Sequence, residues 1–176
     1  RMLKKSGARS EVMIATSLAH FANDVPVTLL SAVLPIVIKE FGLNYAAAGA
    51  LLTSFVFLMT SMQAIPGYVA DRANRIALLF IGLTTLGAGA ILVSYSSDYV
   101  QLLASQCLMG LGARVYHPVG YSLLSDVFEH GQRGKALGLG SAAGDMAIPV
   151  AFVTSGFLVL ILGWRDIFRL WGVFVI

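Results

Sequence analysis

Long apolar runs alternate with short polar segments along the whole chain. A membrane-spanning helix needs about 20 mostly apolar residues, and the runs predict helices at about 13–38, 46–69, 76–96, 99–125 and 135–162, with a sixth from 167 to 176. Because the polar segments between them are short, consecutive helices are expected to lie antiparallel and adjacent. The last run stops at Ile176, short of a full span, so we expect a longer protein with the sixth helix truncated here.

Composition favours a multi-pass membrane protein. Hydrophobic residues make up 57% of the chain and charged residues 12%, whereas soluble domains are about a quarter charged. The single cysteine, Cys107, excludes an internal disulfide and a multi-cysteine metal site. The basic residues lie in short clusters between apolar runs, so the net charge of +3 does not indicate a nucleic-acid partner.

The distribution of basic residues predicts the orientation of the helices. Cytoplasmic loops of membrane proteins carry an excess of lysine and arginine. With a cytoplasmic N-terminus, three bases lie at the outer face, namely Lys39, Arg165 and Arg169. Eight bases then lie inside, namely Arg1, Lys4, Lys5, Arg9, Arg72, Arg75, Arg133 and Lys135. This excess favours a cytoplasmic N-terminus in the cell membrane, plasma or inner.

Ionisable residues interrupt three of the apolar runs at a similar depth. Asp24 lies about 16 Å from the inner end of the first helix, and Asp145 about 15 Å from the inner end of the fifth. Arg114 and His117 lie roughly 18 and 14 Å from the inner end of the fourth. A charge at the bilayer centre costs at least about 2.5–3.5 kcal/mol, so such residues face a protein interior or a water-filled cavity.

Each of these residues belongs to a polar stripe on its helix. His20, Asn23 and Asp24 share one face of the first helix because of their i, i+3, i+4 spacing. The fourth and fifth helices carry similar stripes, formed by Gln106, Gly110, Arg114, His117, Tyr121 and Ser125, and by Gly138, Ser141, Asp145 and Pro149. The three stripes predict the wall of a polar cavity that binds a substrate or protons.

The buried charges allow two interpretations. Asp24 or Asp145 could pair with Arg114 and simply fasten helices together. Alternatively, because one arginine fully balances only one carboxylate, the other carboxylate takes up and releases a proton, and the polar stripes favour this second interpretation. The positive charge of Arg114 and His117 favours an anionic or zwitterionic substrate. Two histidines on different helices with no third ligand are a poor metal site, so neither a metal nor another cofactor is expected.

The loop between the second and third helices carries a family motif. The stretch GYVADRANR resembles the signature of the major facilitator superfamily, Gly-x-x-x-Asp-Arg/Lys-x-Gly-Arg/Lys-Arg/Lys, and four positions match it: Gly67, Asp71, Arg72 and Arg75. Asn74 replaces the second glycine, and asparagine is the next best residue for a left-handed turn. Ile76 replaces the last base. In the family this loop is a cytoplasmic gate that holds the N-terminal half against the C-terminal half.

Other stretches resemble the same superfamily. The segment GWRDIF, ending at Phe168, resembles the family motif between helices five and six. The runs HFANDV and GLGARVYHP resemble the fosmidomycin-resistance-type branch. Gln106 stands where many members carry arginine, and Arg114, two turns deeper, offers a replacement charge. The resemblance covers essentially the whole chain and implies an all-α six-helix N-terminal half, built from two inverted three-helix repeats, of a twelve-helix secondary transporter.

The resemblance also implies a function. It predicts alternating access by rocking against a C-terminal half, with proton-linked movement of a small solute and efflux slightly favoured over proton-symport uptake of an organic anion. Two further classes are weighed on the residues. An intramembrane hydrolase needs a serine nucleophile beside a histidine, and no Gly-x-Ser-Gly occurs in the sequence. A non-transporting receptor has no evident use for the buried charges. The sequence has no phosphate-binding P-loop, so direct ATP drive is unsupported.

Overall fold

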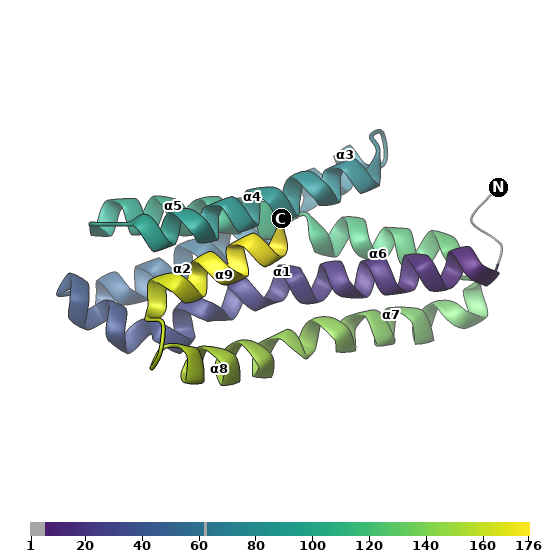
Figure 1. Ribbon diagram of the computed structural model, residues 1–176. Helices are drawn as coiled ribbons and strands as arrows, with labels where there is room; N and C mark the ends of the chain where they lie inside the picture. The colour runs from purple at the N-terminus through teal and green to yellow at the C-terminus, as the bar shows by residue number, and fades with distance from the viewer. Residues whose placement is uncertain (1–5, 62) are drawn as a thin grey trace.

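The computed structural model describes residues 6–61 and 63–176, and the bases Arg1, Lys4 and Lys5 lie outside the described residues. Within the described residues the regular structure is entirely helical (Figure 1). The helices are α1 (Ser6–Phe41), α2 (Tyr45–Ser61), α3 (Ala64–Ala70), α4 (Arg75–Tyr95), α5 (Tyr99–Ala113), α6 (Tyr116–Val127), α7 (His130–Asp145), α8 (Ala147–Leu158) and α9 (Trp164–Val175).

In the described part of the chain, nine helical segments form six successive spans, because α2 with α3, α5 with α6, and α7 with α8 each follow one another along one span. The sequence analysis treated each of these pairs as one helix. Pro118 and Pro149 account for two of the divisions. A proline lacks the N–H that would bond the carbonyl four residues earlier, which here belongs to Arg114 and Asp145. Helix α5 therefore ends just before Arg114 and α7 ends at Asp145, two residues expected near mid-depth from the sequence.

The turns at the ends of the helices follow from local chemistry. Asn74 and Asp98 are the N-caps of α4 and α5, and the Asp98 carboxylate accepts a hydrogen bond from the Gln101 amide at 2.9 Å. Gly42, after α1, and Gly163, before α9, have positive φ values of 61° and 82°. This backbone region is open to glycine at little cost. These signals end the spans and turn the chain back.

Helix α1 is the longest element and runs the length of the molecule in Figure 1. Helices α6 and α7 pack along its first half, and α8 and α9 pack along its second half. On the other side, α4 packs against α5 and α9. The first three spans are α1, α2 with α3, and α4, and the last three are α5 with α6, α7 with α8, and α9. Because three spans cross the molecule an odd number of times, the second group starts at the end opposite to the first. The two three-helix repeats are therefore inverted.

A row of buried apolar residues along the second half of α1 packs against the neighbouring helices. Val25, Leu29, Val33 and Val37 recur every four residues on one face, and each is at most 1% exposed. Small residues bring other helices into close contact. A Cβ at Gly112 of α5 would meet the backbone of α4 at Leu86, so only glycine permits this approach. The rigid packing fixes the depth at which the polar groups of α1 lie.

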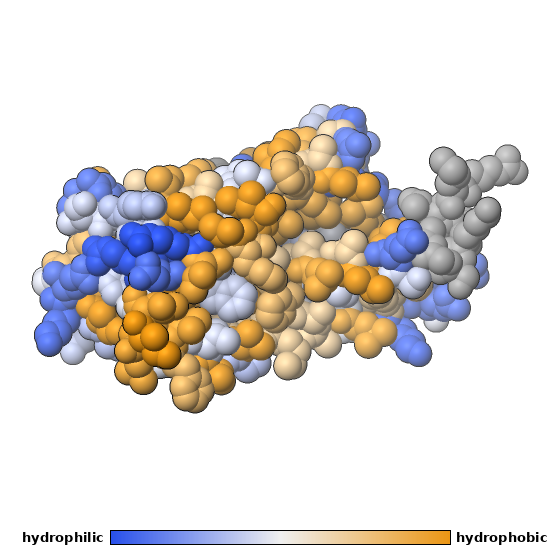
Figure 2. All heavy atoms as spheres, viewed as in Figure 1, coloured by the Kyte–Doolittle hydropathy of each residue, from blue (hydrophilic) through white to orange (hydrophobic). Residues whose placement is uncertain are grey.

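The surface of the bundle suits a lipid environment. By length and composition, four helical stretches among the described residues can cross a membrane: Arg9–Phe41, Tyr45–Ala70, Arg75–Tyr95 and His130–Leu158. Figure 2 shows hydrophobic residues over the middle of the visible face and hydrophilic residues gathered toward its two ends. The chain is a multi-pass membrane protein.

Polar contacts fasten the helices at both ends of the bundle. At the end where α1 begins, Arg9 pairs with Glu129 at 2.7 Å. At the opposite end, Glu40 pairs with Arg165 and accepts a hydrogen bond from the Trp164 indole at 2.6 Å. Arg165 also donates to the Ser96 carbonyl at 3.0 Å, which joins α1, α9 and the end of α4. These charged groups at the two ends of the bundle are therefore paired. Polar groups buried in the middle of the bundle need a separate explanation.

Candidate functional site

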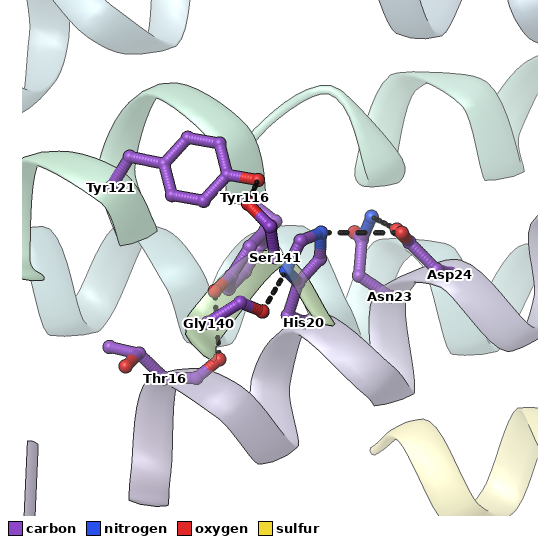
Figure 3. Close-up of polar contacts among 8 residues, drawn as sticks. All are labelled: Thr16, His20, Asn23, Asp24, Tyr116, Tyr121, Gly140 and Ser141. Carbon is purple, nitrogen blue, oxygen red and sulfur yellow. Dashed lines mark hydrogen bonds and ion pairs between the residues drawn. The ribbon is translucent and has the colours of Figure 1, made fainter. Parts of the chain in front are cut away.

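A cluster of polar and aromatic side chains lies where the middle of α1 meets α6 and α7 (Figure 3). Its members come from one turn of α1, from the first turns of α6 and from the last turns of α7. We use the name central polar cluster for His20, Asn23, Asp24, Tyr116, His117, Tyr121, Ser141 and the backbone carbonyl of Gly140. The cluster lies near the midpoint of α1, far from both polar ends of the bundle.

His20 is the centre of the cluster and is only 3% exposed. Its Nδ1 atom lies 2.8 Å from the Gly140 carbonyl oxygen, and its Nε2 atom lies 3.2 Å from Asp24 Oδ2. A carbonyl can only accept, so Nδ1 carries the hydrogen of this bond. A neutral imidazole has a single N–H, and Nε2 would then direct a lone pair at the carboxylate. The contact between His20 and Asp24 therefore needs one further proton, carried by Nε2 or by the Asp24 carboxyl group, or a cation.

Both partners of the Asp24 carboxylate lie on its own helix, α1. Its Oδ1 atom accepts a hydrogen bond from Asn23 Nδ2 at 2.9 Å, and Asn23 is 1% exposed. Its Oδ2 atom faces His20, one turn earlier. In the structure the ionisable group that faces Asp24 is therefore His20, on the same helix. Both carboxylate oxygens have a partner, so the orientation of Asp24 is fixed.

Aromatic rings enclose the His20 imidazole. The ring stacks on Tyr116 with centroids 4.4 Å apart, and it meets His117 and Tyr121 edge-on at 5.2 and 5.7 Å. The Tyr121 hydroxyl lies 3.0 Å from Ser141 Oγ, which ties α6 to α7. The sequence analysis expected the polar stripes to line a cavity. In the structure these side chains pack directly on one another.

Tyr116→Phe is expected to lower the free energy of unfolding by about 1 kcal/mol, the typical net contribution of one hydrogen bond. The Tyr116 hydroxyl donates to the Thr16 carbonyl at 2.8 Å, whereas the ring that stacks on His20 is retained in the variant. Denaturant unfolding in detergent micelles measures the change. Tyr95→Phe is the control, because Tyr95 is 62% exposed. Equal losses in both variants would contradict the assigned role of the hydroxyl.

Gly144 allows α7 to approach His20. A Cβ at this position would overlap the imidazole ring, so a larger residue displaces either the ring or the helix. Gly140, one turn earlier on the same face, offers its carbonyl to His20. The sequence analysis assigned no site role to these glycines or to Tyr116. The i, i+4 spacing of the two glycines, a small-xxx-small pattern, is typical of such a close contact between helices.

The other predicted site residues lie around the cluster. Asp145, the last residue of α7, has an exposed side chain and is close enough to act electrostatically on His20. Arg114 lies half-buried in the division between α5 and α6. Gln106 is 2% exposed within α5, and its amide nitrogen has no hydrogen-bond partner among the described residues. The structure therefore joins His20, Asn23, Asp24, His117 and Tyr121 directly and places Asp145 at their edge.

The cluster brings three possible metal-ligating side chains together. One ligand atom each from His20, Asp24 and His117 lies within 4.8 Å of the others. The sequence analysis considered the two histidines a poor metal site because it found no third ligand. The fold places the Asp24 carboxylate beside both histidines, because His20 and Asp24 share one face of α1 and His117 lies opposite on α6.

The sequence profile of the Major Facilitator Superfamily matches residues 16–176. The chain belongs to this superfamily. It is similar to the riboflavin transporter RibZ of Clostridioides difficile, with 24% identity over 160 residues that cover 89% of this chain and 34% of the relative. It is also similar to the fosmidomycin resistance protein of Escherichia coli, with 28% identity over 107 residues, 61% of this chain and 26% of that protein. The chain thus spans about a third or less of these relatives.

A solved structure has the same fold as this chain. It is a bacterial homolog of the human lysosomal transporter Spinster, in an inward-facing and unoccupied conformation. The TM-score is 0.86 at 20% identity, and the match covers 97% of this chain and 41% of the other. The likeness shows that the six spans have the arrangement found in a transporter of this superfamily.

The superfamily motif lies at the end of the bundle where α1 begins, between α3 and α4. Arg75 pairs with Asp126 at the end of α6, and its Nε donates to the Ala70 carbonyl at 3.3 Å. The Arg72 guanidinium lies 3.9 Å from the centre of the Tyr68 ring. The explanation of Asn74 as a left-handed turn residue is wrong. Its φ is −68°, and its side chain caps α4 by accepting from the Ile76 and Ala77 amides.

Proposed function

We propose that the chain is one half of a secondary transporter that moves a small solute by alternating access and is coupled to protons. The observation that carries this proposal is the contact between the ionisable side chains of His20 and Asp24 near the midpoint of a membrane helix. Ionisable groups at this depth are costly and mark solute or ion pathways. Membership of the superfamily, whose relatives above include a riboflavin transporter, supports the same conclusion.

The position of Asp145 indicates which face of the chain meets the solute path. Its side chain is exposed at the division between α7 and α8, although the residue lies near mid-depth. Charged groups at that depth face a protein interior or water rather than lipid. We infer that this face of α7 and α8 contacts a second half of the transporter or the water-filled path between the halves. The short coverage of the relatives is consistent with a second half.

The two aspartates have different environments, which supports different roles. Asp24 is held by His20 and Asn23. Among the described residues, no hydrogen bond reaches the carboxylate of Asp145, which is open to the path. We propose that Asp145 exchanges the coupled proton and that the central polar cluster contacts the solute. Arg114 and His117 favour an anionic or zwitterionic solute, with Gln106 and Tyr121 as further polar contacts.

The relatives and the charges support a proposal for the direction of transport and for the location of the protein. The fosmidomycin resistance protein, and a puromycin resistance protein of Streptomyces alboniger that is 26% identical over 139 residues, favour efflux. At the end of the bundle where α1 begins lie five described bases: Arg9, Arg72, Arg75, Arg133 and Lys135. We therefore propose a cell-membrane protein whose N-terminus is cytoplasmic. The motif from Gly67 through Asp71 and Arg72 to Arg75 would then gate the cytoplasmic side.

A pH gradient across proteoliposomes that contain the complete protein tests this function. Internal pH is followed while anionic and zwitterionic solutes are added. Asp145→Asn is expected to reduce solute-dependent proton movement at least about tenfold, because the amide cannot exchange a proton. Glu11→Gln is the matched control, since it removes an exposed acid of α1 that lies outside the cluster.

Two results would overturn the proposal. Solute movement that is indifferent to the gradient in the unaltered protein would exclude proton coupling. Unchanged proton movement in Asp145→Asn would exclude this residue as the proton site. Equal losses in Asp145→Asn and Glu11→Gln would show that the effect is one of general charge rather than of a site.

A further inference from the structure

We propose that the central polar cluster binds one divalent first-row transition metal ion, with His20 Nε2, a carboxylate oxygen of Asp24 and the imidazole of His117 as ligands. This inference goes beyond the proposed function, because binding can be measured without any transport. It rests on the convergence of three ligand atoms from α1 and α6 in the middle of the bundle.

The distances suit a compact metal ion. His20 Nε2 and Asp24 Oδ2 are 3.2 Å apart, close to the separation of about 3.3 Å between two ligands of a tetrahedral ion with bonds of about 2.0–2.1 Å. The third ligand lies within 4.8 Å of the others, so His117 has to approach by at most about 1.5 Å to complete such a geometry. His117 is half-buried in the first turn of α6, beside the division from α5, where the chain is not fixed by a continuous helix.

The surrounding hydrogen bonds already orient two ligands. Metal-binding histidines almost always donate their other ring N–H to a carbonyl or carboxylate, which directs the free nitrogen at the metal. The Gly140 carbonyl accepts from His20 Nδ1 at 2.8 Å and so points Nε2 at Asp24. Asn23 holds Asp24 Oδ1 and leaves Oδ2 facing His20. The lone pair of Nε2 and the carboxylate then face each other across a gap that only a positive charge can fill.

The ligand set indicates the class of metal. Imidazole nitrogens suit Zn²⁺, Ni²⁺, Co²⁺ and Cu²⁺, whereas Mg²⁺ and Ca²⁺ prefer oxygen ligands. Three protein ligands leave a further coordination position open, which water or an anionic group of a solute can occupy. The charge balance is suitable, because Asp24 supplies one negative charge and Asp145 lies near enough to act on His20.

Zinc titration of the complete, tag-free and metal-stripped protein in detergent tests the inference. A chromophoric chelator competes for Zn²⁺, and one site per chain is expected. His20→Gln and His117→Gln are each expected to weaken binding at least about tenfold, as loss of a ligand or of its support does in metal sites. His130→Gln is the matched control, because His130 is exposed at the start of α7, away from the cluster.

Two additional measurements guard against variants that simply misfold. Asp24→Asn keeps the shape of the side chain and is also expected to weaken Zn²⁺ binding at least about tenfold. Co²⁺ added to the unaltered protein should give the intense visible absorption of a low-coordinate site, and each ligand variant should lose it. Zinc affinity that is equal in the unaltered protein and in all three ligand variants would overturn the inference, as would the absence of a stoichiometric site.

The outcomes separate this inference from the proposed function. Absence of a stoichiometric zinc site in the unaltered protein, with proton-driven solute movement intact, would overturn the metal inference alone. A stoichiometric zinc site in a protein that moves no solute would support the metal inference and overturn the proposed transport.

Discussion

Gly144→Ala is expected to lower the free energy of unfolding by about 3 kcal/mol, the upper end of the usual cost of overpacking. The added carbon would overlap the His20 ring. That ring has little freedom to move, because Gly140 and Asp24 hold its two nitrogens and Tyr116 stacks on its face. Either α7 moves away from α1 or the ring leaves its hydrogen bonds. Denaturant unfolding in mixed micelles measures the loss.

Gly138→Ala is the matched control for this variant. Gly138 lies on the same helix and is exposed, and a Cβ at this position would meet nothing within 4 Å. Alanine also favours the helix over glycine by up to about 1 kcal/mol, so the control should be neutral or slightly stabilised. If Gly144→Ala were as stable as Gly138→Ala, the close contact between α7 and His20 would not exist in the folded protein.

The sequence was sufficient to predict the all-α membrane fold and the superfamily. Apolar runs of the length of a span are a strong signal, because lipid leaves helices as the main way to satisfy the backbone. The motif around Asp71 and Arg72 then identifies the family. The divisions at Arg114 and Asp145 were harder to foresee. A proline weakens a helix without always dividing it, and α1 continues through Pro26 and Pro35.

The composition of the cluster was predictable only in part. The i, i+3, i+4 spacing placed His20, Asn23 and Asp24 on one face, because that relation is local to one helix. Contacts between helices depend on rotation and register, which a single sequence does not specify. The bond from His20 to the Gly140 carbonyl and the stacking on Tyr116 are of this kind. Every residue has a backbone carbonyl, so the residue types do not indicate which carbonyl accepts a hydrogen bond.

His20→Phe is expected to lower the free energy of unfolding by about 3 kcal/mol. The variant keeps a ring that can stack on Tyr116 but removes both hydrogen-bonding nitrogens. Asp24 then loses its ion-pair partner near the middle of the membrane helix. Breaking a buried pair in this way costs about 3–5 kcal/mol, because an uncompensated charge remains. The lower end applies, since the Asp24 side chain is 19% exposed and keeps its bond to Asn23.

The double variant His20→Phe, Asp24→Asn isolates the cause of that loss. With the charge removed, no buried carboxylate is left without a partner, so most of the stability should return. A double-mutant cycle from four unfolding curves gives the coupling between the two residues, expected to be at least about 2 kcal/mol on this argument. Additive losses would mean that the imidazole stabilises the bundle through its bond to Gly140 and its stacking alone. In that case the positive charge between His20 and Asp24, on which the buried pair depends, would be absent.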